Sequence, residues 1–426
     1  MNSINFSLYI HWPFCVQKCS YCDLNSHVRD HIDENLWVSA LINEMRTMKK
    51  CIPNAKLISI FFGGGTPSLL SALNINLIIQ EANKLWQLDL QTEITLETNP
   101  SSLETRNLVE FKQAGINRIS FGIQSLDNQI LKLLNRSHNA EEAMFCIDKA
   151  ITIFDNISVD IIYALPTQTL TTLQNTFSQL LPKKIQHISI YELTLHQNTK
   201  LYNQIEKQEL HLPKEDAVSD QYNLILQECE RFGYYRYEIS SFSKKGYKSI
   251  HNTSYWKSRN FIGIGPGAHS RCFISSSNIE DNIFIQQPND GLDLQTYDHS
   301  LKLQRQAAIQ KTNSIQYYEI ENEKIPEKWL SKVQKLGYGT KNCFVLEQTV
   351  QIQEFIMMGL RMTEGIKISD FYKRFNQNLC AVLNSNKIQK LIDYKYLDMD
   401  DENIKLTNEG IIRHSAICHY LLFTDN

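Results

Sequence analysis

Three cysteines within eight residues carry the strongest chemical signal in the chain. Cys15, Cys19 and Cys22 lie in one short segment, so their thiolates can face a common point, as a metal centre requires. Structural zinc usually takes four ligands from two separated pairs, and here there is one triplet. Three cysteines on a four-iron cluster leave one iron open to an exchangeable ligand, which is a reactive arrangement. The triplet therefore favours a [4Fe–4S] cluster, and the alternative is zinc with one further ligand from the same region: His11, His27 or Asp23.

A glycine-rich loop, Gly63–Pro67, follows the apolar run Leu57–Phe62. Glycines let backbone amides approach the amino or carboxylate group of a ligand, and Thr66 adds a hydroxyl. Taken alone, such a loop is more often a tight turn. Glu97 ends a later strand-like run, where a carboxylate can accept from a ribose or an ammonium group, although an acid at a strand end is often only solvated.

His251 stands close to two large aromatic residues, Tyr255 and Trp256. Imidazole is an axial ligand of haem iron, and aromatic rings pack on a porphyrin face. A lone histidine is more often a polar group whose hydrogen bonds are satisfied within the fold. The pattern leaves both interpretations of His251 open, a haem ligand and a structural hydrogen-bonding residue.

The segment from Tyr9 to Cys22, with its CxxxCxxC spacing, resembles the signature of the radical S-adenosylmethionine superfamily. More narrowly, the chain is similar to the oxygen-independent coproporphyrinogen III oxidase family, with matches in register from Tyr9 to about Ser270. The resemblance implies a [4Fe–4S] cluster on the three cysteines and bound S-adenosylmethionine. It also assigns a set of residues to S-adenosylmethionine: Tyr9, Tyr21, Gly64, Gly65, Thr66, Glu97, Gln124, Arg136 and Asp160.

Some members of that set have a specific expected role. The glycine-rich loop resembles the loop that receives the methionyl amino group in this superfamily. Arg136 can form a bidentate pair with a carboxylate, although an arginine after a helix is often only a surface residue. Tyr21, between two of the cysteines, can pack beside the adenine or simply wall the loop.

The HNxxYW pattern from His251 to Trp256 resembles the haem-binding signature of the HemW branch, whose members are haem chaperones rather than oxidases. The resemblance implies a haem site made of four residues: His251, Asn252, Tyr255 and Trp256. Two departures from the oxidases support this branch. Leu24 stands where the oxidases carry a further cysteine, and Tyr9 lies almost at the start, where the oxidases have an N-terminal extension.

The function that this resemblance implies is binding of haem and its transfer to an acceptor protein. Acceptors include respiratory proteins, with transient membrane contact through such an acceptor. The alternative is the oxidase reaction, the oxidative decarboxylation of coproporphyrinogen III. Both functions need the same cluster and cofactor, so the cysteines do not discriminate between them, and cleavage of S-adenosylmethionine during turnover stays open.

The elements that must position these residues alternate between strand and helix over residues 5–240. This repetition predicts a parallel sheet with right-handed crossovers, and six such units favour a partial (β/α)6 barrel over an open sheet. Active sites of barrels assemble at the C-terminal ends of the strands, where the cysteine triplet falls. We expect an α/β barrel domain over residues 1–275, a polar connecting segment over 276–345, and a smaller α+β winged-helix-like domain over 346–426.

Composition narrows the class of protein further. The 426 residues carry a net charge of −3 and 42% hydrophobic residues, which excludes disorder and any global attraction to nucleic acid. The last predicted helix, Asn408–Leu422, holds Arg413 as its only arginine or lysine, so a DNA-reading role for the C-terminal domain is disfavoured. We expect no membrane span and no signal peptide. Seven further cysteines are scattered singly, as in a reducing compartment, and the expected location is the cytoplasm.

Overall fold

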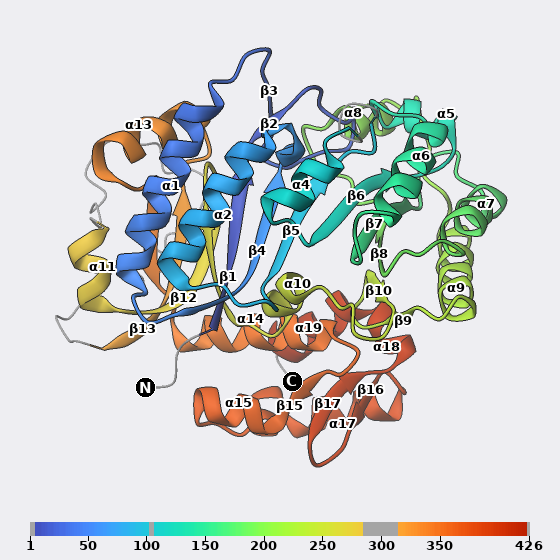
Figure 1. Cartoon of the computed structure of the whole chain (residues 1–426). Helices are drawn as coiled ribbons and strands as arrows, with labels where there is room; N and C mark the ends of the chain where they lie inside the picture. The colour runs from blue at the N-terminus through green and yellow to red at the C-terminus, as the bar shows by residue number, and fades with distance from the viewer. Residues whose placement is uncertain (1–4, 102–105, 284–313, 424–426) are drawn as a thin grey trace.

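The computed structural model describes residues 5–101, 106–283 and 314–423. Its centre is a twelve-stranded sheet in which six strands follow one another in sequence order, each parallel to the next (Figure 1). These strands are β1 (Asn5–Trp12), β4 (Lys56–Gly64), β5 (Glu93–Thr98), β6 (Arg118–Gln124), β7 (Ile157–Tyr163) and β8 (His187–Glu192). The α/β class and the six strand–helix units predicted for this region are confirmed.

Helices follow each of these strands, and those that lie between two parallel strands form the crossover connections. They are α1 (Glu34–Cys51), α2 (Ala72–Trp86), α4 (Leu108–Ala114), α5 (Asn128–Leu133), α6 (Ala140–Ile151), α7 (Leu170–Leu180), α8 (Lys200–Glu206) and α9 (Glu215–Arg231). After α9, β9 (Tyr235–Arg236) and β10 (Ser241–Ser243) add two short strands beyond β8.

Side chains along the parallel strands alternate between an apolar and a polar face, since successive residues of a strand point to opposite sides. In β1, Phe6, Leu8 and Ile10 are fully buried and belong to the main hydrophobic core. The intervening Ser7 is equally buried but polar, and its hydroxyl accepts from Ser59 Oγ of β4 at 2.8 Å. The apolar face takes the helices, and the polar face lines the barrel interior, where the predicted site residues of these strands lie.

Four strands from the second half of the chain extend the sheet beyond β1. They are β11 (Asn260–Ile264), β12 (His269–Ser275), β13 (Ile315–Asn322) and β14 (Thr340–Val345). β11 runs parallel to β1, and the other three continue antiparallel. The N-terminal strand is therefore internal to the sheet.

The segment 276–345 is more regular than the polar connection expected from the sequence. Its described parts comprise α11 (Ser276–Asn282) and the unit made of β13, α13 (Pro326–Leu336) and β14. Apart from the adjacent Tyr317 and Tyr318, buried and half-buried positions alternate along β13, so the strand lacks the continuous apolar run that marks a strand covered on both faces. Residues 315–345 thus belong to the main sheet and its covering helices, while the exact domain boundaries stay a prediction.

Glu44 of α1 joins this extension to the barrel. Its carboxylate is buried, and four hydrogen bonds take the place of water. One carboxylate oxygen accepts from Asn322 Nδ2 at 3.1 Å and from the Gly339 amide at 2.7 Å. The other accepts from the Gly265 amide at 2.8 Å and from Trp329 Nε1 at 3.0 Å. Four donors from separate segments thus converge on one side chain.

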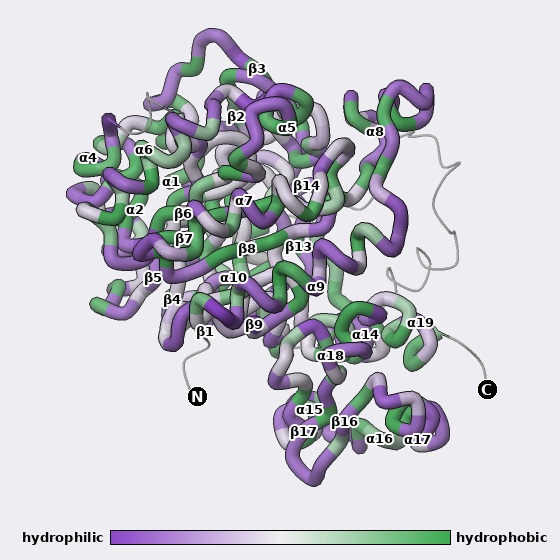
Figure 2. Tube along the Cα trace, turned by 90° about the vertical axis from the view of Figure 1, so that its right-hand side faces the viewer, coloured by the Kyte–Doolittle hydropathy of each residue, from purple (hydrophilic) through white to green (hydrophobic). Residues whose placement is uncertain are grey.

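The C-terminal region forms a second, smaller hydrophobic cluster below the barrel (Figures 1 and 2). A three-stranded sheet in the order β15–β17–β16 packs with short helices. The elements are α14 (Gln348–Arg361), β15 (Ile366–Lys367), α15 (Ile368–Phe375), α16 (Leu379–Leu383), α17 (Ser385–Asp393), β16 (Leu397–Met399), β17 (Asn403–Leu406), α18 (Asn408–Ile412) and α19 (His414–Phe423). The helix predicted over Asn408–Leu422 is two helices, α18 and α19, that meet at Arg413. Within the described ranges, no helix combines the length and apolarity needed to cross a bilayer.

The Glu44 contacts generate a stability prediction. Glu44→Gln replaces one acceptor oxygen with an amide group, which leaves two buried donors facing a donor. Each buried donor that loses its acceptor costs about 1–3 kcal/mol, so the free energy of unfolding should fall by about 2 kcal/mol or more in urea titration. Glu81→Gln is the control, because its partner Arg46 is half exposed, and it should cost at most about 1 kcal/mol. Equal losses in the two variants would contradict the role given to Glu44.

Candidate functional site

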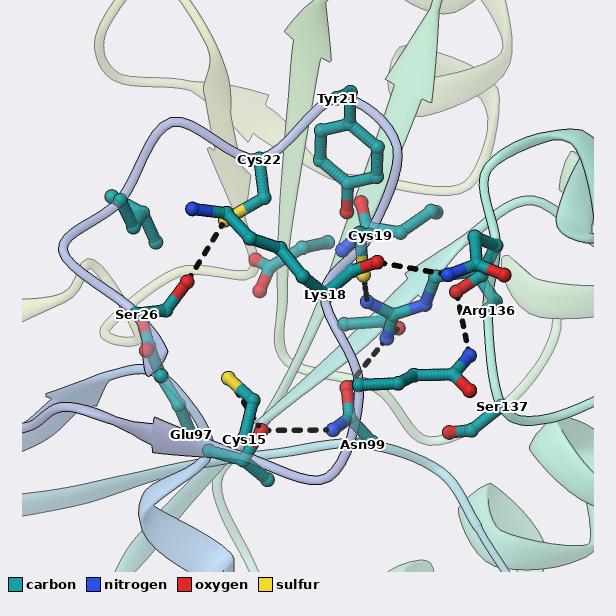
Figure 3. A pocket seen from close by; sticks show the side chains of 18 of the residues that line it. Cys15, Lys18, Cys19, Tyr21, Cys22, Ser26, Glu97, Asn99, Arg136 and Ser137 are labelled. Atoms are coloured by element: carbon teal, nitrogen blue, oxygen red, sulfur yellow. Dashed lines mark hydrogen bonds between the residues drawn. The ribbon is translucent and has the colours of Figure 1, made fainter. Parts of the chain in front are cut away.

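A cavity of about 600 Å³ lies at the C-terminal ends of the parallel strands (Figure 3). It is lined by the cysteine segment after β1, the glycine loop after β4, and the ends of β5 to β8. Every residue that the sequence assigned to the cluster or to S-adenosylmethionine lines this cavity, except Tyr9. Tyr9 lies inside the barrel, where its hydroxyl is 3.0 Å from His11 Nδ1.

The cysteine segment begins at β2 (Phe14–Cys15), which pairs with β3 (His27–Val28). Burial raises the pKa of the Cys15 and Cys22 thiols. Each thiol has its own polar neighbour: Thr66 Oγ1 donates to Cys15 Sγ at 3.4 Å, Arg136 Nη1 donates to Cys19 Sγ at 3.3 Å, and Ser26 Oγ lies 3.9 Å from Cys22 Sγ. The three sulfur atoms thus surround a shared space, as Figure 3 shows.

The arrangement of the thiols separates the two metal interpretations. In the described parts of the chain, no three histidine, cysteine or acidic side chains are placed to hold one metal ion. A [4Fe–4S] cluster takes each cysteine on a different iron, so sulfur atoms around a shared space fit it. The nearby histidines are engaged elsewhere: His11 Nε2 lies 2.9 Å from the Asn25 carbonyl oxygen, and His27 Nε2 lies 3.1 Å from Asn25 Oδ1. The donor set fits the cluster better than zinc.

The glycine loop is locked onto the cysteine segment by close backbone contacts. The Gly65 amide donates to the Trp12 carbonyl at 2.7 Å, and the Thr66 amide donates to the Phe14 carbonyl at 2.8 Å. A Cβ on Gly65 would lie 2.7 Å from the Phe14 oxygen and 3.0 Å from Cys15 Sγ. Only glycine therefore allows this approach, and the missing side chain keeps the space beside Cys15 open.

Two carboxyl groups face the cavity from the polar face of the sheet. Burial, together with the nearby Asp160 carboxylate, raises the pKa of Glu97 to about 8. Burial also raises the pKa of Asp160, whose carboxylate accepts from Ser120 Oγ at 3.3 Å. Arg118 lowers both pKa values and Arg136 lowers that of Asp160, but these charges do not offset the burial. A positively charged ligand in this cavity would therefore stabilise the ionised forms of both groups.

Arg136 connects the strand ends to the cysteine segment. Its Nη2 donates to Asn99 Oδ1 and to the Gly122 carbonyl, both at 2.6 Å. The β6–β7 register shifts between Gly122 and Gln124, and Gln124 has a φ of 66°. Left-handed backbone at a non-glycine residue is strained and is kept where the surroundings impose it, here at the cavity wall.

Sequence reasoning missed several residues of the cavity wall. Asn99 holds Arg136 and also donates to Thr66 Oγ1 at 3.4 Å, and its only signal was a polar side chain just after a strand. Lys18, Tyr191 and His196 also line the cavity, as does Asp23, which the sequence offered only as a zinc ligand. Tyr191 and His196 come from the end of β8 and the loop behind it, where no recognisable motif stands.

The four predicted haem residues lie away from this cavity, in α10 (Ile250–Trp256). His251 is 1% exposed, and burial lowers its pKa to about 3. Its Nδ1 is 3.0 Å from Ser59 Oγ and its Nε2 is 2.8 Å from Tyr255 OH, while its ring stacks on Phe61 with 4.8 Å between centroids. Both ring nitrogens thus lie within hydrogen-bond distance of a hydroxyl group. This environment agrees with the second interpretation of His251, a structural hydrogen-bonding residue.

Helix α10 is fixed at both ends. At its N-terminus the Glu93 carboxylate accepts from the amides of Ile250 and His251, at 3.1 and 3.0 Å. At its C-terminus the Arg361 guanidinium of α14 lies 4.4 Å from the Trp256 ring. The helix therefore joins the closed end of the barrel to the C-terminal region, and iron ligation by His251 would require it to undock.

Comparison with known proteins agrees with the fold and the site. Residues 9–180 match the radical SAM superfamily, and residues 346–413 match the HemN C-terminal domain. Among solved structures, coproporphyrinogen III oxidase (HemN) from Escherichia coli superposes with a TM-score of 0.76 at 17% identity, covering 99% of this chain and 91% of that one. That likeness establishes the fold. Fold and site together define a radical S-adenosylmethionine protein.

Relatives at higher identity place the chain more narrowly. Radical S-adenosyl methionine domain-containing protein 1, mitochondrial, from Danio rerio is 32% identical over 99% of this chain and 88% of its own length. Heme chaperone HemW from Buchnera aphidicola subsp. Acyrthosiphon pisum is 36% identical over 67% of this chain and 75% of its own length. Within the radical S-adenosylmethionine superfamily, the chain therefore belongs to the HemW family.

The environment of His251 generates a second stability prediction. His251→Ala removes a buried ring and leaves Tyr255 OH without its 2.8 Å partner, so unfolding should become easier by about 2–4 kcal/mol. Below pH 6.5 the unfolded histidine binds a proton that the native one, with its lowered pKa, does not. The free energy of unfolding of the wild type should therefore fall as the pH drops from 6.5 toward 3. The variant should lack the part of this pH dependence that comes from His251.

Chemical denaturation across that pH range measures both effects. His211→Ala, at an exposed histidine, serves as the control and should change stability by less than about 0.5 kcal/mol. A loss at His251 as small as at His211 would mean that the ring contributes little to the fold.

Proposed function

We propose that this chain binds haem and delivers it to an acceptor protein, on a radical S-adenosylmethionine scaffold. The observation that carries the proposal is its similarity to proteins named heme chaperone HemW, at 36% identity over three quarters of such a relative. The HNxxYW pattern from His251 to Trp256 and the leucine at position 24 support the same branch. Leu24 is 53% exposed at the cavity wall, where an oxidase-type sequence has another cysteine.

Cys15, Cys19 and Cys22 would hold a [4Fe–4S] cluster in this proposal. Burial raises the pKa of the Cys15 and Cys22 thiols, so these two release protons when they bind metal. When bound, the cluster supplies an electron and one open iron position for S-adenosylmethionine. Arg136 positions Cys19 through its hydrogen bond to the sulfur.

The remaining cavity residues would bind and orient S-adenosylmethionine. Glu97 and Asp160 favour its positively charged groups, and cation binding lowers the pKa of Glu97 from about 8, so that it ionises at neutral pH. The glycine loop offers close backbone contact at Gly64 and Gly65, and Thr66 offers its hydroxyl. Tyr21 and Gln124 wall the cavity beside the cofactor. Tyr9 does not line the cavity. It would support the site indirectly, through its hydrogen bond to His11 below the glycine loop.

Haem-accepting proteins, respiratory ones among them, are the proposed partners. We propose a cytoplasmic location, with transient membrane contact through an acceptor. All ten cysteines lie in the described residues and none forms a disulfide, which fits a reducing compartment.

The cluster assignment predicts the metal content. Anaerobically reconstituted protein should hold about four irons and four sulfides per chain, and Cys19→Ser should abolish this, because three protein thiolates anchor the cluster. Cys380→Ser, in the C-terminal region, should leave the iron content unchanged. A colourless protein with one equivalent of zinc would refute the assignment.

Parallel assays on the reconstituted protein test chaperone against oxidase. With ferric haem, the protein should show a Soret band distinct from that of free haem, and it should pass the haem to an apoprotein acceptor. With reductant, S-adenosylmethionine and coproporphyrinogen III, it should release no carbon dioxide. Carbon dioxide release without stable haem binding would return the chain to the oxidase function, the alternative that the shared fold raises.

A further inference from the structure

A histidine–carboxylate pair stands at the wall of the cofactor cavity. His196 Nδ1 lies 3.2 Å from Asp23 Oδ2, with the two side chains 43% and 47% exposed. Asp23 directly follows the last cysteine of the triplet, and His196 belongs to the loop between β8 and α8. Both residues line the cavity. The pair therefore faces the space beside the proposed cluster and remains open to solvent.

The pair has the two groups, and a short Nδ1–Oδ2 distance, found behind many metal-ligating histidines. Such a histidine usually donates one ring N–H to a carboxylate, which fixes the tautomer and raises the basicity of the other nitrogen. In His196 that other nitrogen is Nε2, for which the described residues offer no hydrogen-bond partner. An exposed ion pair contributes about 0–1 kcal/mol to stability, so the pair is not needed for the fold. His251 is the opposite case, with both nitrogens engaged in the interior.

The loop that carries His196 is anchored to the cysteine segment. The Thr199 amide and hydroxyl both donate to the His196 carbonyl, at 3.3 and 2.8 Å. Two residues further on, the Leu201 amide donates to the Ser20 carbonyl at 2.8 Å. The backbone at His196 is thus held at a fixed place relative to the cysteines, which limits the positions that the imidazole can take.

The surroundings of the pair match the remaining parts of a haem. Val16 and Leu24 are 66% and 53% exposed, and both line the cavity from the cysteine segment, where they can cover a macrocycle. Lys18, exposed between them in the sequence, supplies a positive charge for a propionate. The cavity holds about 600 Å³, a volume typical of a site for one small molecule, so we place the porphyrin across its mouth, outside the space assigned to S-adenosylmethionine.

We propose that His196, oriented by Asp23, is the axial ligand of the haem iron, with the macrocycle lying over Val16 and Leu24 at the mouth of the cofactor cavity. This inference rests on the proposed function, since it locates the haem that a chaperone carries. It gives His251 a structural role instead. It also means that bound haem covers the exit of S-adenosylmethionine, so occupancy of the two sites is coupled.

Titration of the full-length protein with ferric haem, read from the Soret band, tests the site. His196→Ala should lose the Soret position of the wild-type complex, which axial imidazole ligation sets. Asp23→Asn should keep the band but weaken affinity by about ten- to a hundredfold, the usual effect of removing a carboxylate behind a ligating histidine. His211→Ala, at an exposed histidine outside the cavity, and His251→Gln, which keeps polar atoms in the interior, should bind haem as wild type does.

Iron-free protoporphyrin IX separates ligation from simple contact. It lacks the iron, so His196→Ala should bind it as tightly as wild type does. Equal loss of haem and protoporphyrin in this variant, or an unchanged Soret band, would overturn the ligand assignment. So would loss of the haem band in a folded His251→Gln variant with intact iron–sulfur absorbance. If wild-type protein binds no haem at all, the proposed function fails, whatever the variants do.

Discussion

Polar side chains on the inner face of the parallel sheet are shut away from water, and burying them requires partners. At the closed end of the barrel these partners come from the fold itself. His187 is hydrogen-bonded to Ser158 and Tyr237, and Glu93 receives the first amides of α10. At the open end, Glu97 and Asp160 carry raised pKa values because the fold supplies no full compensation. The need to pair buried polar groups is thus met by hydrogen bonds within the protein at the closed end of the barrel. At the open end it is met only when a ligand is bound.

The main features of the fold and the cavity were predictable because they depend on local pattern. The cysteine spacing, the glycine loop after β4 and the strand–helix repetition are each visible within a few residues, and all of them fall where the pattern puts them. In β1, for example, apolar residues alternate with polar ones, because one face of the strand packs on the helices and the other lines the barrel interior. The residues at the ends of those strands meet because the strands are parallel.

What the sequence could not supply were contacts between distant segments. Glu44 looks like any acid on an amphipathic helix, and nothing near it predicts donors from residues 265, 322, 329 and 339. His251 and His196 illustrate the same limit. One sits in a recognisable pattern and is sealed in the interior, while the other sits in no pattern and faces the cavity. Exposure and free nitrogens are tertiary properties, so they appear only once β4, α10 and the loop behind β8 are in place.

β1 pairs on one side with β4 and on the other with β11. During translation β4 is synthesised soon after β1, and β11 much later. A ribosome adds roughly 5–20 residues per second, so about 10–50 seconds separate the synthesis of β1 from that of β11. Asn25, within the cysteine segment, waits longer still, since its side chain donates to the carbonyls of Pro266 and Lys324. The cysteine segment is translated well before these partners and is therefore among the last parts of the chain to settle, so its thiols lack their final surroundings while the later residues are being translated.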